Sequence, residues 1–102
     1  MIDISSDILD KLKLRLHILD DETDENLKEM LKASIVKLNN TCGDFDINTN
    51  EQARELVFER VRYIYNDVLE HFETNFSREI TDLQMHLFLE RSDDIEETKP
   101  NV

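Results

Sequence analysis

One stretch of this sequence has side chains whose types and spacing could bind a metal ion. Oxygen-bearing side chains recur at the alternating positions of a twelve-residue loop: Asp44, Asp46, Asn48, Asn50, Gln52 and Glu55. This is the ligand spacing of an EF-hand calcium loop. The match is flawed, because position six is Thr49, where the sharp turn of such a loop needs Gly. Position eight is also unusual, since it is Glu51 and not an apolar residue.

Turn chemistry explains the same residues without a metal. Asp and Asn side chains favour turns, and Thr49 with Gln52 three residues later fits a capping box at the start of a helix. We therefore expect no metal and no cofactor. A calcium-dependent helical module remains an alternative, which predicts a change in helicity or stability on adding calcium that is absent in Asp44→Ala.

The other residues that could do chemistry are scattered along the chain. His17, His71 and His86 have no partner at a metal-ligand spacing, and a chain with a single Gly has no Gly-rich phosphate loop. Cys42 is the only cysteine, which excludes a disulfide within the chain, and it is expected to be a half-buried apolar residue near a helix end. The sequence therefore does not predict an enzyme.

Charge narrows the classes of partner. The formal net charge of −12, from 24 acidic and 12 basic residues, disfavours tight binding of duplex DNA by the free surface. The acidic run Asp20–Glu25 is interpreted as the start of a helix, where the dipole favours carboxylates, and not as a metal site. Lys11, Lys13 and Arg15 form a local basic excess, interpreted as a solvated face or, alternatively, a contact with an acidic partner.

The elements that must position these residues are helices. With one Gly, one Pro and 39% hydrophobic residues, the composition favours long helices joined by short turns, and hence an all-α fold. The longest periodic stretch, residues 50–72, predicts one long central helix. Its apolar residues recur at steps of three and four: Val57, Val61, Ile64, Val68 and Phe72.

Shorter helices are expected to pack along the central one, giving a small bundle of about four. The first helix should begin at Ser5 or Ser6, the second should run from Asp24 to about Thr41, and Gly43 should end it. The first helix presents four apolar residues on one face: Ile8, Leu12, Leu16 and Leu19. A last helix is expected from Ser77 to about residue 91, although the alternation from Leu83 to Leu89 also allows a strand. Residues 1–91 would form the domain and residues 92–102 a disordered acidic tail.

The predicted helices have more apolar surface than one copy of the chain can bury. Such a surplus usually marks a partner surface or self-association, and a head-to-tail contact between copies builds rings or filaments.

The order of these elements resembles that of the head-tail connector proteins of tailed bacteriophages, also called adaptor or head-completion proteins. The shared pattern covers roughly residues 10–90. A short first helix ends in an apolar and acidic turn at Leu19, Asp20 and Asp21. A helix then opens near Leu27 and closes at Gly43 with Phe45 just beyond, and a long helix with a Tyr near its middle follows. Relatives often carry Gly and Pro after that helix, and FSREITDLQMHLF carries neither.

The resemblance implies a virion protein that sits at the head-tail interface and assembles in the host cytoplasm. Its subunits would form a homo-oligomeric ring, commonly of about a dozen copies, beneath the portal protein after DNA packaging. The ring would extend the DNA channel without binding DNA specifically and provide a platform for the stopper or tail-completion protein, with no membrane involved. The free protein would be monomeric or self-associated. The segment that would dock on the portal supplies six residues: Ser77, Ile80, Leu83, Met85, Leu87 and Phe88.

A second class of function fits the charge. A small acidic helical regulator, or a DNA mimic, would bind a basic partner one to one and lose affinity steeply with salt, whereas a connector held by apolar faces would tolerate salt.

Overall fold

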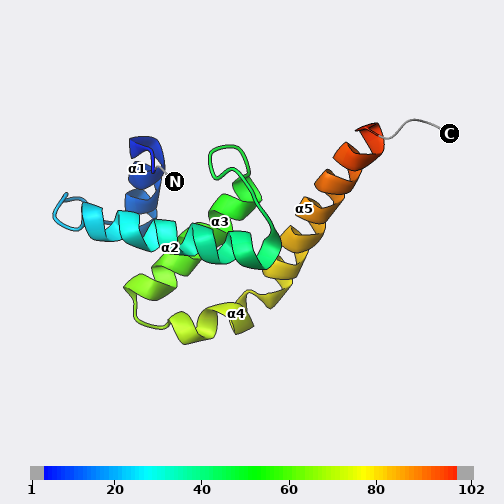
Figure 1. The fold of residues 1–102 in the computed structure, drawn as a ribbon. Helices are drawn as coiled ribbons and strands as arrows, with labels where there is room; N and C mark the ends of the chain where they lie inside the picture. Colours follow the sequence, from blue (N-terminus) through cyan, green and yellow to red (C-terminus); the bar gives the residue numbers. More distant parts are fainter. Residues whose placement is uncertain (1–3, 99–102) are drawn as a thin grey trace.

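The computed structural model describes residues 4–98, with the side chains of residues 4–91, and the chain is all-α over this range (Figure 1). The helices are α1 (Ser6–Leu16), α2 (Asp24–Cys42), α3 (Glu51–Tyr65), the short 3-10 helix η1 (Leu69–His71), α4 (Phe72–Asn75) and α5 (Ser77–Thr98). The fold class predicted from composition is confirmed.

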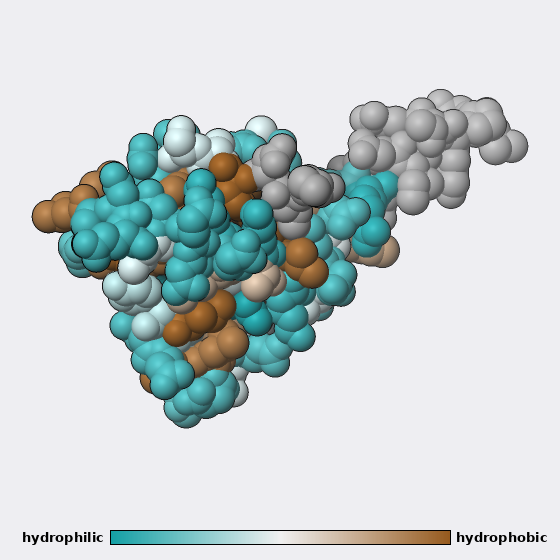
Figure 2. All heavy atoms as spheres, turned by 60° about the vertical axis from the view of Figure 1, so that its left-hand side comes forward, coloured by the Kyte–Doolittle hydropathy of each residue, from teal (hydrophilic) through white to brown (hydrophobic). Residues whose placement is uncertain are grey.

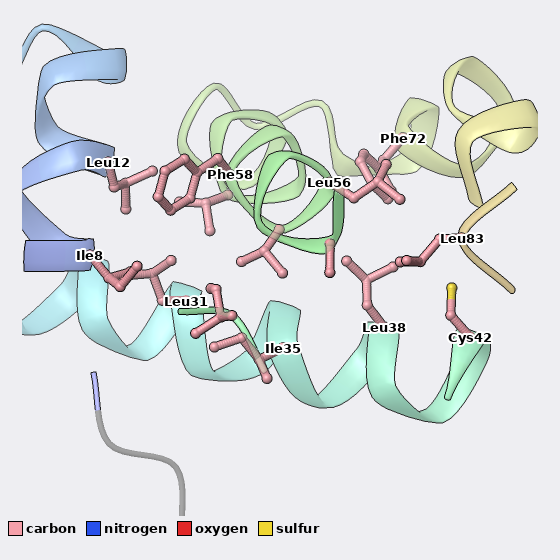
Figure 3. Packing of buried hydrophobic residues seen from close by; sticks show 14 of the residues in the cluster. Ile8, Leu12, Leu31, Ile35, Leu38, Cys42, Leu56, Phe58, Phe72 and Leu83 are labelled. Carbon is pink, nitrogen blue, oxygen red and sulfur yellow. The ribbon is translucent and has the colours of Figure 1, made fainter. Parts of the chain in front are cut away.

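The core lies along α2, which packs chiefly on α3, while α1 and α5 pack at its two ends. Figure 3 shows Ile8 and Leu12 of α1 meeting Leu31 and Phe58 at one end. At the other end, Leu38 and Cys42 of α2 face Leu83 of α5. The core is thus continuous through the bundle, and α5 extends beyond it in Figure 1, so that the molecule measures 58 × 29 × 20 Å.

The predicted central helix over residues 50–72 is wrong, because α3 ends at Tyr65. The Val68 N–H donates to the Tyr63 carbonyl and the Asp67 N–H to the Ile64 carbonyl, with Asp67 in the left-handed region at φ 61°. These two bonds form a Schellman motif, which closes a helix and usually uses Gly. The apolar period continues across the break, so the pattern gave no sign of it.

The break brings together aromatic rings that a straight helix would separate. In a continuous helix, Tyr63 and Phe72 would lie roughly 13 Å apart along the axis. After the turn their ring centroids are 5.7 Å apart, and Phe76 lies 5.6 Å from Tyr63. Phe72 is buried, whereas Val68, predicted on the same apolar face, is exposed.

The first helix also ends earlier than its apolar pattern suggests. Ser5 caps α1 by accepting from the Ile8 N–H at 3.2 Å. A second Schellman motif closes the helix after Leu16, with His17 left-handed at φ 61°. Leu19 therefore lies in the turn and is 94% exposed, so its predicted place on the buried face is wrong.

The last element is a helix in this structure. Residues 77–91 lie within α5, which continues to Thr98, beyond the predicted end near residue 91. The predicted tail, residues 92–102, therefore overlaps α5 as far as residue 98, and its last four residues lie outside the described residues.

Candidate functional site

The calcium-like stretch forms a turn and the start of α3. Asp46 Oδ1 accepts from the Asn48 N–H at 2.9 Å, and the Asp46 carbonyl accepts from the N–H groups of Thr49 and Asn50. Asn50 Oδ1 accepts from the Ala53 N–H at 3.0 Å. Asn50 is therefore the N-cap of α3, and the prediction that Thr49 is the cap was wrong by one residue. Either residue type can cap, and only the backbone geometry decides which one does.

The remaining residues of the calcium pattern have other partners. Gln52 Oε1 lies 2.7 Å from His86 Nδ1 of α5, and Glu55 forms an ion pair with Arg15 of α1. Asp44 is exposed beside the turn. Among the described residues, no group of three or more His, Cys, Asp or Glu side chains is placed to hold a metal ion.

A hollow of about 610 Å³ opens between this turn and α5. Its walls include the carboxylates of Asp44, Asp46, Glu51 and Glu90 together with His86. Such walls can accept hydrogen bonds from a basic group.

The thiol of Cys42 and the imidazoles of the three histidines do not form a common site. Cys42 is buried, its Sγ lies 3.8 Å from the Ile80 carbonyl, and burial raises the pKa of the thiol. A raised pKa leaves the thiol protonated and unreactive at neutral pH. His17, His71 and His86 are all exposed, on separate elements.

The basic residues of α1 make ion pairs within the chain. Lys13 is buried, and its Nζ lies 2.7 Å from Asp21 and 2.8 Å from Asp24. Hydrogen bonds to these two carboxylates raise the pKa of Lys13, and the hydrogen bond from Lys13 lowers the pKa of Asp21. Asp21 and Asp24 of the acidic run after α1 therefore form ion pairs within the chain. Lys13 is buried and does not belong to a solvated face.

A second ionic cluster joins α1 to α3. Arg15 pairs with Glu55 and with Glu59, the latter at 3.0 Å, and its guanidinium lies 5.3 Å from the centre of the Phe58 ring. Arg62 binds Glu59 at 2.6 Å. Burial alone would raise the pKa of Glu59, but hydrogen bonds from Arg62 and Arg15 outweigh it and lower that pKa. No local sequence pattern indicates the contact between Arg15 and α3, because these residues lie about forty positions apart.

The six residues predicted to dock on the portal separate into two groups. Ile80, Leu83 and Leu87 belong to the core, where they pack toward α2 and α3. Ser77, Met85 and Phe88 are exposed; Met85 is 55% and Phe88 57% exposed. Leu89, which was not among the six, is exposed beside them. We call Met85, Phe88 and Leu89 the α5 outer stripe.

A different apolar patch lies at the other end of the molecule. Leu14 is 73% exposed and Leu19 94% exposed, and both line a shallow hollow beside the turn between α1 and α2. That turn and α5 lie at opposite ends of the fold in Figure 1. In Figure 2, hydrophilic side chains cover most of the visible face and apolar ones emerge between them in separate patches.

Within residues 4–98, no helix is long and apolar enough to cross a membrane. Comparisons with protein-family models, with curated proteins and with solved structures found no match to this chain.

Proposed function

We propose that this chain is a structural subunit of a head-tail connector ring in a tailed bacteriophage. In this role it binds the portal protein on one side, offers the stopper or tail-completion protein a platform on the other, and lets DNA pass through the ring. The work is done by shape and binding, without chemistry.

The observation that supports this proposal most is the α5 outer stripe. Three large apolar side chains lie in solvent at helical spacing on a helix that extends beyond the bundle (Figure 1). Contiguous exposed apolar surface usually marks an interaction site. Because Ile80, Leu83 and Leu87 are already buried in the core, the docking surface for the portal is the outer stripe with Ser77, and not all six predicted residues.

The acidic balance is compatible with a DNA channel. A wall with net negative charge repels phosphates and gains little affinity from counterion release, so a passing duplex does not adhere. The formal net charge of the chain is −12.

The experiment is sedimentation of the purified chain, alone and mixed with portal assemblies encoded in the same genome, at low and high salt. The connector is expected to co-sediment with the portal at both salt concentrations, because apolar contacts tolerate salt. Phe88→Ser should weaken this binding, and Thr81→Ser, an exposed change on the same helix, should leave it unaltered. A chain that ignores the portal under both conditions would overturn the proposal.

The alternative function is a small acidic regulator that binds a basic partner. It is favoured by a hollow between α3 and α5 whose rim carries Glu55, Glu59, Glu79 and Asp82. A basic probe such as polylysine would then form a complex that weakens steeply with salt, and the portal would not bind.

A further inference from the structure

The hollow between α3 and α5 combines an apolar floor with an acidic rim. It has a volume of about 280 Å³, and Leu56 and Phe76 form its apolar part. Two pairs of carboxylates stand around it, one on α3 and one on α5: Glu55, Glu59, Glu79 and Asp82. An apolar floor within a charged rim suits an amphipathic side-chain cluster of opposite charge.

The two pairs of carboxylates differ in how they are neutralised. Glu55 and Glu59 on α3 are paired with Arg15, and Glu59 also with Arg62. Among the residues whose side chains are described, Glu79 and Asp82 on α5 have no ion-pair partner within 4.0 Å. A cation that enters the hollow would therefore pair with Glu79 and Asp82 on the α5 wall.

The outward face of α2 has the complementary composition. From Lys32 to Thr41 the sequence has two lysines and no carboxylate, in a chain with twice as many acidic as basic residues. Val36 lies between the lysines and is 46% exposed. Within the described part of the chain, Lys32 and Lys37 make only long ion pairs, 4.0 Å to Glu29 and 3.8 Å to Glu73. We call Lys32, Val36 and Lys37 the α2 outer face.

The two surfaces lie on opposite sides of the bundle. On α3, the rim carboxylates Glu55 and Glu59 are about half a turn away from Ala53, Val57 and Val61, which are buried on the side of α3 that packs on α2. The α2 outer face is similarly opposite the buried face of α2. One copy of the chain therefore cannot bring the two surfaces together, but two copies can.

We infer that the hollow receives the α2 outer face of a second copy of this chain. Val36 packs on the partly exposed ring of Phe76, and Lys32 and Lys37 pair with Glu79 and Asp82. Because the contact joins two different surfaces, it leaves one of each free and repeats head to tail, which closes a ring or extends a filament. The inference rests on the proposed function and names the subunit contact of the ring.

The test is a charge swap measured by sedimentation velocity from micromolar to millimolar protein. One variant carries Lys32→Glu and Lys37→Glu, and the other carries Glu79→Lys and Asp82→Lys. The wild type is expected to associate with rising concentration, and each variant alone to associate about tenfold or more weakly. An equimolar mixture of the two variants should associate again, because each surface then meets an opposite charge on the other variant.

Two controls separate the contact from folding and from net charge. All four positions are at least partly exposed, so helicity by circular dichroism and the midpoint of thermal unfolding should be unchanged. Lys11→Glu on α1 alters the net charge as much as Lys32→Glu alone does, but lies outside both surfaces, so the single variant Lys32→Glu should weaken association and Lys11→Glu should leave it unaltered.

The outcomes distinguish this contact from the connector function. A wild type that associates regardless of the four substitutions, or variants that are not rescued by mixing, would overturn the contact while leaving a ring possible. A wild type that stays monomeric to millimolar concentration but binds the portal would overturn the contact in free protein and retain the connector. A monomer that also ignores the portal would overturn both.

Discussion

The first and last helices both leave apolar side chains in solvent, but they are joined to the bundle by different forces. Helix α1 buries Ile8, Leu9 and Leu12 and adds ion pairs through Lys13 and Arg15. Helix α5 is twice as long, 22 residues against 11, and its buried apolar side chains among residues 77–91 are one stripe of three: Ile80, Leu83 and Leu87.

The difference separates residues that fold the monomer from residues that are free for partners. On α1, cations that the sequence presents as a surface patch are used within the chain, so charge there stabilises the monomer. On α5, one face is core and the opposite face is the exposed outer stripe, so a substitution acts differently on the two faces of a single helix.

The largest expected effect on stability comes from a substitution on the buried, inner face of α5. Leu83→Ala removes a side chain with no exposed surface and should lower the free energy of unfolding by about 2–5 kcal/mol. Met85→Ala, two residues along on the outer stripe, should change it by less than about 0.5 kcal/mol. Urea unfolding monitored by circular dichroism measures both, and equal losses at the two positions would contradict the division of α5 into two faces.

A smaller loss of stability is expected when the ion pairs between α1 and α3 are removed. Arg15→Met keeps an unbranched aliphatic side chain but removes the guanidinium that pairs with Glu55 and Glu59 and lies over the Phe58 ring, and should cost about 1 kcal/mol in the same assay. Lys11→Met removes only an exposed pair with Asp7, 3.3 Å long, and serves as the control, with a change near zero. If Lys11→Met cost as much as Arg15→Met, the contact between α1 and α3 would not be the cause.

Glycine is expected to stabilise the turns after α1 and before η1. His17 and Asp67 both have φ 61°, where a residue with a Cβ is strained by about 1 kcal/mol. His17→Gly and Asp67→Gly should therefore raise the free energy of unfolding, by up to about 1 kcal/mol. Glu29→Gly, within α2, should lower it by a similar amount. A loss of stability at either left-handed position would show that its side chain contributes more than the strain costs.

The smallest expected effect is a dependence on pH. The pKa of Glu59 is lowered in the folded chain, so its contribution to stability is present above the unfolded value near 4.5 and is lost as the pH falls through the lower, folded pKa. The free energy of unfolding should fall less between pH 5.5 and pH 3 in Glu59→Gln than in wild type, a difference of a few tenths of a kcal/mol at this partly exposed site. Parallel pH profiles for the two proteins would mean that Glu59 does not titrate with folding.

The sequence by itself determined the helical class, the identity of most of the core and the absence of a recognisable catalytic motif. Gly and Pro are scarce, and the apolar residues recur at steps of three and four. This spacing places residues such as Leu31 and Leu38 on one face of a helix, where they can be buried. Turn residues around Asp46 and Asn50 likewise favour a loop followed by the start of a helix, and the structure has both.

Only the tertiary structure decided where the helices end and which charges meet. The apolar period runs through residues 66–68 unaltered, and the chain turns at Asp67 because the turn lets Phe72 and Phe76 pack on Tyr63, a gain that no local pattern records. No local pattern records the ion pairs of Arg15 either. The same holds for the placement of the α2 outer face opposite the α3–α5 hollow. They depend on distances between residues far apart in the chain, and those distances are fixed only when the core forms.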